Sequence, residues 1–169
     1  CGIVGILTSS SMRGGDLSRA VERMRDTLVH RGPDDAGAWT GAAAETAVGL
    51  GFRRLSIIDL SELGHQPMAS PSGRFTMVFN GEVYNFAALR RDLEAASARF
   101  RGHSDTEVML AAFDFWGIEA SVRRFVGMFA IAVWDAERRT LSLVRDRLGK
   151  KPLFVYRHAG TVLFGSLSF

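Results

Sequence analysis

The sequence feature that most constrains the fold is a series of short apolar segments separated by residues that favour tight turns. Residues 129–134 and 141–144 flank the polar stretch 135–139, which is typical of two antiparallel strands in a hairpin. A second pair of segments flanks a turn at 158–160. This second pair is 153–156 and 162–164. The other expected strands are 2–7, 37–39, 47–52 and 74–79. Consecutive hairpins favour antiparallel sheets over a parallel sheet with crossover helices.

Helical patterns fall in two places along the chain. Asp16 can cap a helix whose apolar residues repeat every three or four positions as far as Leu28. Asn85 can cap a second helix, and a third begins near Ser104 or Asp105. Residues 30–35 have the composition of a loop. The sequence therefore predicts an α+β protein with antiparallel sheets.

Length and composition limit the classes of function. The 169 residues suffice for a single domain, 1–169, with a hydrophobic core, since 47% are hydrophobic and 23% charged. The net charge of +3 comes from arginines spread along the chain, which favours a solvated surface over a nucleic-acid site. No apolar run reaches the ~18 residues of a membrane span, and no signal peptide or nucleotide-binding glycine motif occurs. We expect a cytoplasmic protein that binds neither nucleic acid nor membrane.

The single cysteine is the first residue of the chain. It can form no internal disulfide, and with four scattered histidines it gives no metal-binding spacing. Once an initiator methionine is removed, Cys1 carries a thiol and an α-amino group together. A thiol of pKa near 8.5 needs a base, and an amine of pKa about 7.7–8.0 can serve. Cys1 is therefore either a nucleophile or simply the residue at which the chain starts. Gly2 would let a substrate approach the backbone.

Two further groups of residues have a functional and a structural interpretation. Asn80-Gly81 can be an ordinary hairpin turn, or can supply a side-chain and a backbone N–H to an oxyanion hole. Arg54, Glu82 and Asp105 have the charges that would bind the two ends of a free amino acid. The chain contains 18 acidic and 21 basic residues, so residue type alone selects none of them.

Eight motifs follow one another along nearly the whole chain. They are Cys1-Gly2-Ile3-Val4-Gly5, His30-Arg31-Gly32-Pro33-Asp34, Arg54-Leu55-Ser56-Ile57-Ile58-Asp59, Gln66-Pro67-Met68, Phe79-Asn80-Gly81-Glu82-Val83-Tyr84-Asn85, Ser104-Asp105-Thr106-Glu107-Val108, Gly127-Met128-Phe129-Ala130-Ile131 and Arg145-Asp146-Arg147-Leu148-Gly149-Lys150-Lys151-Pro152-Leu153. In this order they resemble the N-terminal glutaminase domain of asparagine synthetases, among the class II glutamine amidotransferases.

The resemblance implies a four-layer αββα sandwich, with two antiparallel sheets face to face and helices outside. It also implies that the chain hydrolyses glutamine to glutamate and ammonia. The implied catalytic residues are Cys1, with its own amine as the base, and Asn80 with Gly81 as the oxyanion hole. The implied substrate-binding residues are Arg54 for the carboxylate, Glu82 and Asp105 for the ammonium, and the backbone of Leu55, Ser56, Ile57 and Ile58. Arg53 is expected at the surface, and His30 is expected to be structural.

Asparagine synthetases continue into an ATP-binding domain that consumes the ammonia, whereas this sequence stops at Phe169. We expect a piece of a larger amidotransferase, a standalone protein being the alternative. No cofactor is expected in this domain, because ATP and Mg²⁺ would bind only in the synthetase domain. Two other functions stay open. One is a catalytically idle module that assembles with a synthetase partner. The other is a different N-terminal-nucleophile hydrolase such as an acylase, which the pair Arg54 and Asp105 disfavours.

Overall fold

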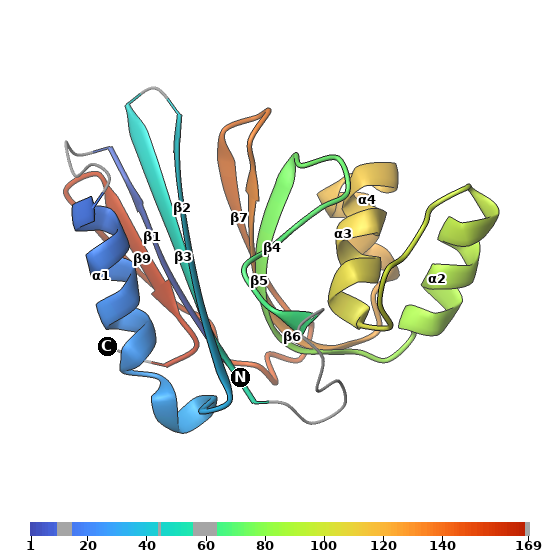
Figure 1. The fold of residues 1–169 in the computed structure, drawn as a ribbon, viewed down its shortest axis with the longest axis horizontal. Coiled ribbons are helices and arrows are strands. Elements are labelled where there is room, and N and C mark those ends of the chain that lie inside the picture. The colour runs from blue at the N-terminus through green and yellow to red at the C-terminus, as the bar shows by residue number, and fades with distance from the viewer. Residues whose placement is uncertain (10–14, 44, 56–63, 168–169) are drawn as a thin grey trace.

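The computed structural model describes residues 1–9, 15–43, 45–55 and 64–167 (Figure 1). A five-stranded antiparallel sheet has the strand order β2-β3-β1-β9-β8. Its strands are β1 (Gly2–Thr8), β2 (Asp35–Ala43), β3 (Thr46–Arg54), β8 (Phe154–His158) and β9 (Thr161–Gly165). The first strand thus lies at the centre of the sheet, paired with β3 on one side and with β9 on the other.

A four-stranded antiparallel sheet has the order β4-β5-β6-β7. Its strands are β4 (Met68–Ala69), β5 (Phe75–Val83), β6 (Gly127–Asp135) and β7 (Thr140–Arg145). The hairpin of β6 and β7 and that of β8 and β9 confirm the two expected from the turn sequences. Strand β4 has only two residues, so within the described part of the chain it pairs with only Thr76 and Met77 of β5.

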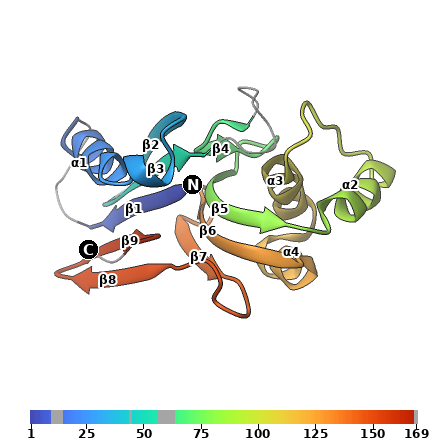
Figure 2. The same cartoon turned by 90° about the horizontal axis from the view of Figure 1, so that it is seen from below.

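The helices lie on the outside of the two sheets, as Figures 1 and 2 show. Helix α1 (Gly15–Asp26) packs on the five-stranded sheet through Leu17 and Val21. The helices α2 (Phe86–Ala95), α3 (Asp105–Trp116) and α4 (Ile118–Arg124) cover the other sheet, and the 3-10 turn Val29–Arg31 follows α1. The four-layer αββα sandwich is therefore confirmed.

Two apolar cores hold the layers together. Between the sheets, inward-facing residues of both pack on one another, among them Ile3, Phe52, Val78 and Trp134. Outside the four-stranded sheet, a larger core joins its other face to α2 and α3. Burial of such side chains is the main favourable term in folding.

Several local predictions were wrong. Asn80 and Gly81 lie inside β5, opposite Ala130 and Phe129, because long-range pairing with β6 overrides the local turn preference. Asp16 lies in the first turn of α1, which already includes Gly15. Asn85 does precede α2, but its side chain bonds the backbone near α4 instead of capping. Strand β4 and helix α4 were not predicted, whereas the start of α3 after Ser104 is confirmed.

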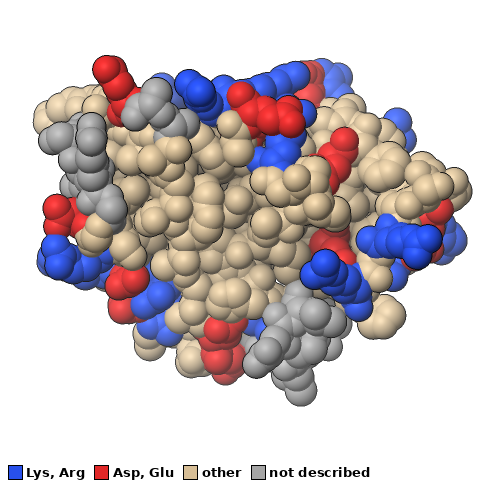
Figure 3. All heavy atoms as spheres, turned by 45° about the horizontal axis from the view of Figure 1, so that its top comes forward, with Lys and Arg blue, Asp and Glu red and all other residues tan. Residues whose placement is uncertain are grey.

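Charged side chains of both signs occur on the surface of the domain (Figure 3). On the face drawn in Figure 3, basic and acidic side chains are intermixed around the periphery and leave the centre of the face uncharged. Within the described ranges, no helix has the length and apolar character needed to cross a bilayer.

Candidate active site

Cys1 lies where the two sheets come together. The N-terminus is beside the start of β1 and close to β5 in Figure 2. The Cys1 Sγ is 3.5 Å from the backbone nitrogen of Leu55 and 3.8 Å from its carbonyl oxygen, so the thiol is held against the chain just after β3. Gly2 was expected to let a substrate approach the backbone, and the structure shows a packing reason for a glycine at this position. A Cβ there would lie 2.9 Å from Leu28, so Gly2 allows β1 to pack under residues 28–31.

The surroundings of the Cys1 α-amino group favour its neutral form. Its pKa is lowered from 8.0 to about 6, mainly because burial disfavours the charged amine. The positive charges of Arg31 and Lys151 lower this pKa further, and Asp34 opposes them. Asp146 accepts the N–H groups of Lys150 and Lys151, both at 2.9 Å, and so fixes the loop that brings Lys151 to the site. At neutral pH the amine is therefore mostly unprotonated and available as a base.

A cavity of about 270 Å³ opens beside Cys1. It is lined by residues of both sheets, of α3 and of the loops around them. The lining residues are Cys1, Phe52, Arg54, Leu55, Gly64, Gln66, Phe79, Asn80, Gly81, Glu82, Phe86, His103, Ser104, Asp105, Thr106, Met128 and Lys151. Every predicted site residue that the structure describes belongs to this set. Ser56, Ile57 and Ile58 lie outside the described residues.

Asn80 lines the cavity and carries a buried hydrogen-bond donor. The residue is only 2% exposed, and its Nδ2 has no hydrogen-bond partner among the described residues. A buried donor without a partner costs free energy, and such groups are rare in proteins. An oxyanion hole would require a donor of this kind in the same cavity as the attacking group.

Gly81 also lines the cavity, and its backbone N–H points away from β6. Its partner in β6, Phe129, directs its own N–H and carbonyl away from β5, toward Asp146, at 3.2 and 2.8 Å. Gly81 and Phe129 are therefore a non-hydrogen-bonded pair, and the Gly81 N–H faces the edge of β5 beyond the end of β4. Gly81 has φ +151°, and a Cβ would lie 2.0 Å from the carbonyl oxygen of Met128. Only glycine fits there, so this donor is also free of side-chain obstruction.

Charged groups line other parts of the cavity wall. Arg54 is buried, and its guanidinium packs against Gly64. A Cβ added to Gly64 would lie 2.3 Å from Nη2 of Arg54. Asp105 begins α3 and accepts the N–H of Val83 through Oδ2 at 3.0 Å. Burial raises the pKa of the Asp105 carboxyl, and the charge of Glu82 raises it further, against the Val83 hydrogen bond. The positive charge of a bound cation would oppose both effects, because it favours the ionised carboxylate.

Arg53 and His30, which were not expected at the site, both lie away from the cavity. Arg53 is not a surface residue: its side chain is 15% exposed and binds Asp26 at 2.6 Å, on the opposite side of β3 from the cavity wall formed by Arg54. His30 lies exposed in the 3-10 turn and is not among the cavity-lining residues.

Five polar cavity residues were given no role at the site from the sequence: Gln66, His103, Ser104, Thr106 and Lys151. Gln66, Ser104, Thr106 and Lys151 lie within the motifs quoted above, which was the available signal.

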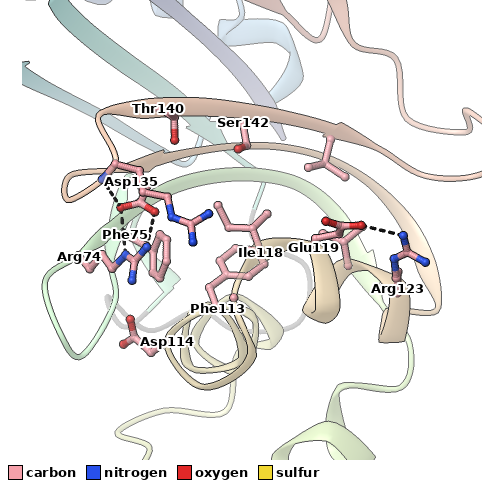
Figure 4. Close-up of a pocket in the computed structure, with 14 residues that line it drawn as sticks. Arg74, Phe75, Phe113, Asp114, Ile118, Glu119, Arg123, Asp135, Thr140 and Ser142 are labelled. Atoms are coloured by element: carbon pink, nitrogen blue, oxygen red, sulfur yellow. Dashed lines mark hydrogen bonds and ion pairs between the residues drawn. The ribbon is translucent and has the colours of Figure 1, made fainter.

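A larger hollow of about 540 Å³ lies on the helix side of the four-stranded sheet (Figure 4). Four of its charged residues form ion pairs: Arg74 binds Asp135 at 2.7 Å, and Arg123 binds Glu119 at 2.7 Å. Cys1 is not part of it. Among the residues that the structure describes, no cluster of three His, Cys, Asp or Glu side chains could hold a metal ion. The cavity beside Cys1 is therefore the candidate active site.

Comparison with known proteins identifies the family. The family model described as a glutamine amidotransferase domain matches residues 1–168. The chain belongs to this family. The amidotransferase domain is 40% identical over 168 residues to asparagine synthetase [glutamine-hydrolyzing] 3 of Bacillus subtilis, a match that covers 98% of this chain and 26% of the relative. It is 36% identical over 171 residues to the amidase chry2 of Gibberella zeae, covering 96% and 25%.

The fold is also found among solved structures. The glutamine phosphoribosylpyrophosphate amidotransferase of B. subtilis superposes with a TM-score of 0.80 at 19% identity, over 98% of this chain and 42% of the other. At this identity the match concerns the fold alone. The amidotransferase domain spans about a quarter of the length of the curated relatives described above.

Proposed function

We propose that the domain hydrolyses the side-chain amide of glutamine, with Cys1 as the nucleophile, and releases glutamate and ammonia. The observation that carries the proposal is the arrangement at one cavity of a thiol, an amine of lowered pKa on the same residue, and the buried, unpartnered Nδ2 of Asn80. Membership of the glutamine amidotransferase domain family supports glutamine as the source of the amide.

In the first half of the reaction, the neutral α-amine accepts the thiol proton, directly or through one water. The thiolate attacks the amide carbon, and the oxyanion that forms accepts hydrogen bonds from Asn80 Nδ2 and the Gly81 N–H. Collapse of this intermediate breaks the carbon–nitrogen bond, and the protonated amine returns its proton to the leaving ammonia. Cys1 is left as a thioester of the glutamyl group.

In the second half, water replaces ammonia. The α-amine takes a proton from this water, which attacks the thioester through a second oxyanion in the same hole. The carbon–sulfur bond breaks, the thiolate regains its proton, and glutamate leaves. This chemistry needs only groups of the chain and water, so we propose no cofactor for this domain.

The charges of the cavity suit a free amino acid. Arg54 would bind the α-carboxylate, and Asp105 with Glu82 would bind the α-ammonium. Asp105 accepts backbone N–H groups, among them that of Val83 through Oδ2, and its carboxylate would accept the ammonium of the ligand with its remaining lone pairs. Leu55 would contribute backbone groups, as would Ser56, Ile57 and Ile58. An acylase would have no need of opposed charges for a zwitterion.

We further propose that the ammonia passes to an ATP-dependent synthetase domain or subunit that forms an amide, with ATP and Mg²⁺ bound there. The relatives named as asparagine synthetases are about four times as long as this domain, which supports a second catalytic unit. The alternative, an idle module for assembly, gains no support from the cavity, because the nucleophile and both oxyanion donors are present.

The test is to incubate the protein with glutamine and to assay glutamate and ammonia. Equal amounts of both products are expected, and Cys1→Ala, as the matched control, should form neither. A glutamyl adduct on the N-terminal residue, trapped by acid quench and located by mass spectrometry, would identify the nucleophile. If the wild type forms no product while it remains folded and binds glutamine, the idle module is the better description.

A further inference from the structure

The edge of β5 that faces the cavity carries three successive backbone donors. Because alternate residues of a strand direct their N–H groups to the same side, those of Phe79, Gly81 and Val83 share this edge. Gln66 Oε1 accepts the N–H of Phe79 at 2.6 Å, and Asp105 Oδ2 accepts that of Val83 at 3.0 Å. The two acceptors flank the N–H of Gly81, a residue that lines the cavity.

Gln66 occupies the place where β4 would continue. Met68 pairs with Met77 and Ala69 with Thr76, so one more step of two residues in this register sets Gln66 opposite Phe79. The backbone has left the sheet by then. The carbonyl oxygen of Gln66 lies against Gly37 of β2, where a Cβ would be only 1.8 Å away. The side-chain oxygen Oε1 of Gln66 therefore accepts the Phe79 N–H that a backbone carbonyl of a longer β4 would accept.

The other end of the same side chain reaches α3. Gln66 Nε2 donates to Thr106 Oγ1 at 3.4 Å, and both residues are 4% exposed. Thr106 follows Asp105, and Phe79 precedes Asn80. One buried amide thus links the strand that carries the oxyanion donors to the helix that carries the proposed ammonium acceptor.

We infer that Gln66 is a positioning residue for amide hydrolysis, because it fixes the edge of β5 so that Asn80 and Gly81 face the carbon that Cys1 attacks. The inference rests on the proposed function. If the Gln66 acceptor is lost, the buried Phe79 N–H is left unpaired and the strand shifts to satisfy it. Oxyanion donors stabilise the transition state only when they are held in place, and displacement by about 1 Å can cost 100-fold in rate.

The experiment replaces Gln66 by methionine, which has similar length and no amide acceptor. The matched control is Ser70→Ala, because Ser70 Oγ accepts the N–H of Phe75 at 3.2 Å, at the end of β5 away from the cavity. Both substitutions should lower the melting temperature. Only Gln66→Met should lower kcat for glutamine, by about 10- to 100-fold, with a smaller change in KM.

A second readout separates positioning from general loosening of the site. Alkylation of Cys1 by iodoacetamide forms no oxyanion, so its rate should stay within about twofold of wild type in Gln66→Met. Gln66→Asn, in which the amide is one methylene too short to reach Phe79, should lose kcat in the same way and carries the test if the methionine variant does not fold.

Two outcomes would overturn the inference, and they differ from failure of the proposed function. One is an active wild type in which the folded Gln66 variants keep their kcat. The other is a loss of kcat that Ser70→Ala reproduces. A wild type that does not hydrolyse glutamine would instead overturn the proposed function, and this inference with it.

Discussion

Asp105 accepts the N–H of Val83 through Oδ2 at 3.0 Å, so the residue that begins α3 also secures the end of β5. The same carboxylate lines the cavity and has a raised pKa, caused first by burial and then by Glu82. Most substitutions of Asp105 would therefore weaken both the end of β5 and the binding of the ligand. A substitution that keeps an oxygen to accept the Val83 N–H and removes only the negative charge would affect the ligand alone. Asp105→Asn does this.

The first prediction concerns the binding of the α-carboxylate and the α-ammonium group of glutamine. A charge-assisted hydrogen bond contributes about 1.5–3 kcal/mol, so Arg54→Ala and Asp105→Asn should each lower kcat/KM by roughly 10- to 150-fold. Arg54→Ala should also abolish discrimination against glutamine whose α-carboxylate is amidated. Asp105→Asn should do so for glutamine acylated on its α-amine. The measurement is kcat/KM for glutamine and both analogues.

The control for that prediction is the neighbouring helix cap. Ser104 Oγ accepts the N–H of Glu107 at 3.3 Å, so Ser104→Ala should cost about 0.5–2 kcal/mol of stability without changing the preference for unblocked glutamine. If Asp105→Asn behaves like Ser104→Ala, Asp105 is structural. If the wild-type preference survives in both charge variants, the proposed amino-acid site is wrong.

The second prediction concerns the oxyanion hole. Asn80→Ala should lower kcat by about 10²–10³-fold with a smaller effect on KM, because the bond to the oxygen strengthens in the transition state. The free energy of unfolding should fall by no more than about 1 kcal/mol, since Nδ2 has no partner to lose among the described residues. Steady-state kinetics and urea unfolding measure the two effects. A rise in KM alone would mean that Asn80 binds the ground state.

The third prediction concerns the N-terminus. One residue added before Cys1 converts the amine into an amide, which is not a base, so turnover should be lost while the fold is kept. Intact-mass analysis, circular dichroism and the ammonia assay on the extended and the authentic protein check this. Full turnover by protein whose mass shows the added residue would exclude the α-amine as the base.

The fourth prediction concerns pH. Because the pKa of the Cys1 amine is about 6, kcat/KM should rise as pH increases through 6 and level off near 7. Lys151→Gln removes one of the charges that lower this pKa, so the midpoint should move upward, toward 8.0. Lys150→Gln is the matched control, because Lys150 is exposed and outside the cavity lining. Equal midpoints in the two variants would contradict the role of Lys151.

The lowered pKa of the Cys1 amine also makes the free energy of unfolding depend on pH. Between pH 6 and 8 the unfolded chain, with the ordinary pKa of 8.0, binds more protons at this group than the folded chain does. The contribution of the amine to the free energy of unfolding therefore increases as pH rises through this window. Below pH 6 the amine is charged in both states, and its burial costs the most.

The sequence by itself determined the hairpins, the main helices and the order of the motifs. Apolar alternation and turn residues are local signals, so the pairs β6–β7 and β8–β9 and the start of α3 could be predicted. The motifs, through their resemblance to one family, also indicated Cys1, Asn80 and Asp105 as site residues. Each of these inferences uses residues close together in the chain.

Only the tertiary structure decided how these residues act. Asn80 and Gly81 have the local signature of a turn, yet pairing with β6 places them in a strand, because the apolar core buried by that pairing outweighs the turn preference. The side to which the Gly81 N–H points follows from the orientation of Phe129, 48 positions along the chain, toward Asp146. The contact of Gln66 with Phe79 likewise requires β4 to end where it does. Such relationships depend on strand register, which is set by packing between distant segments.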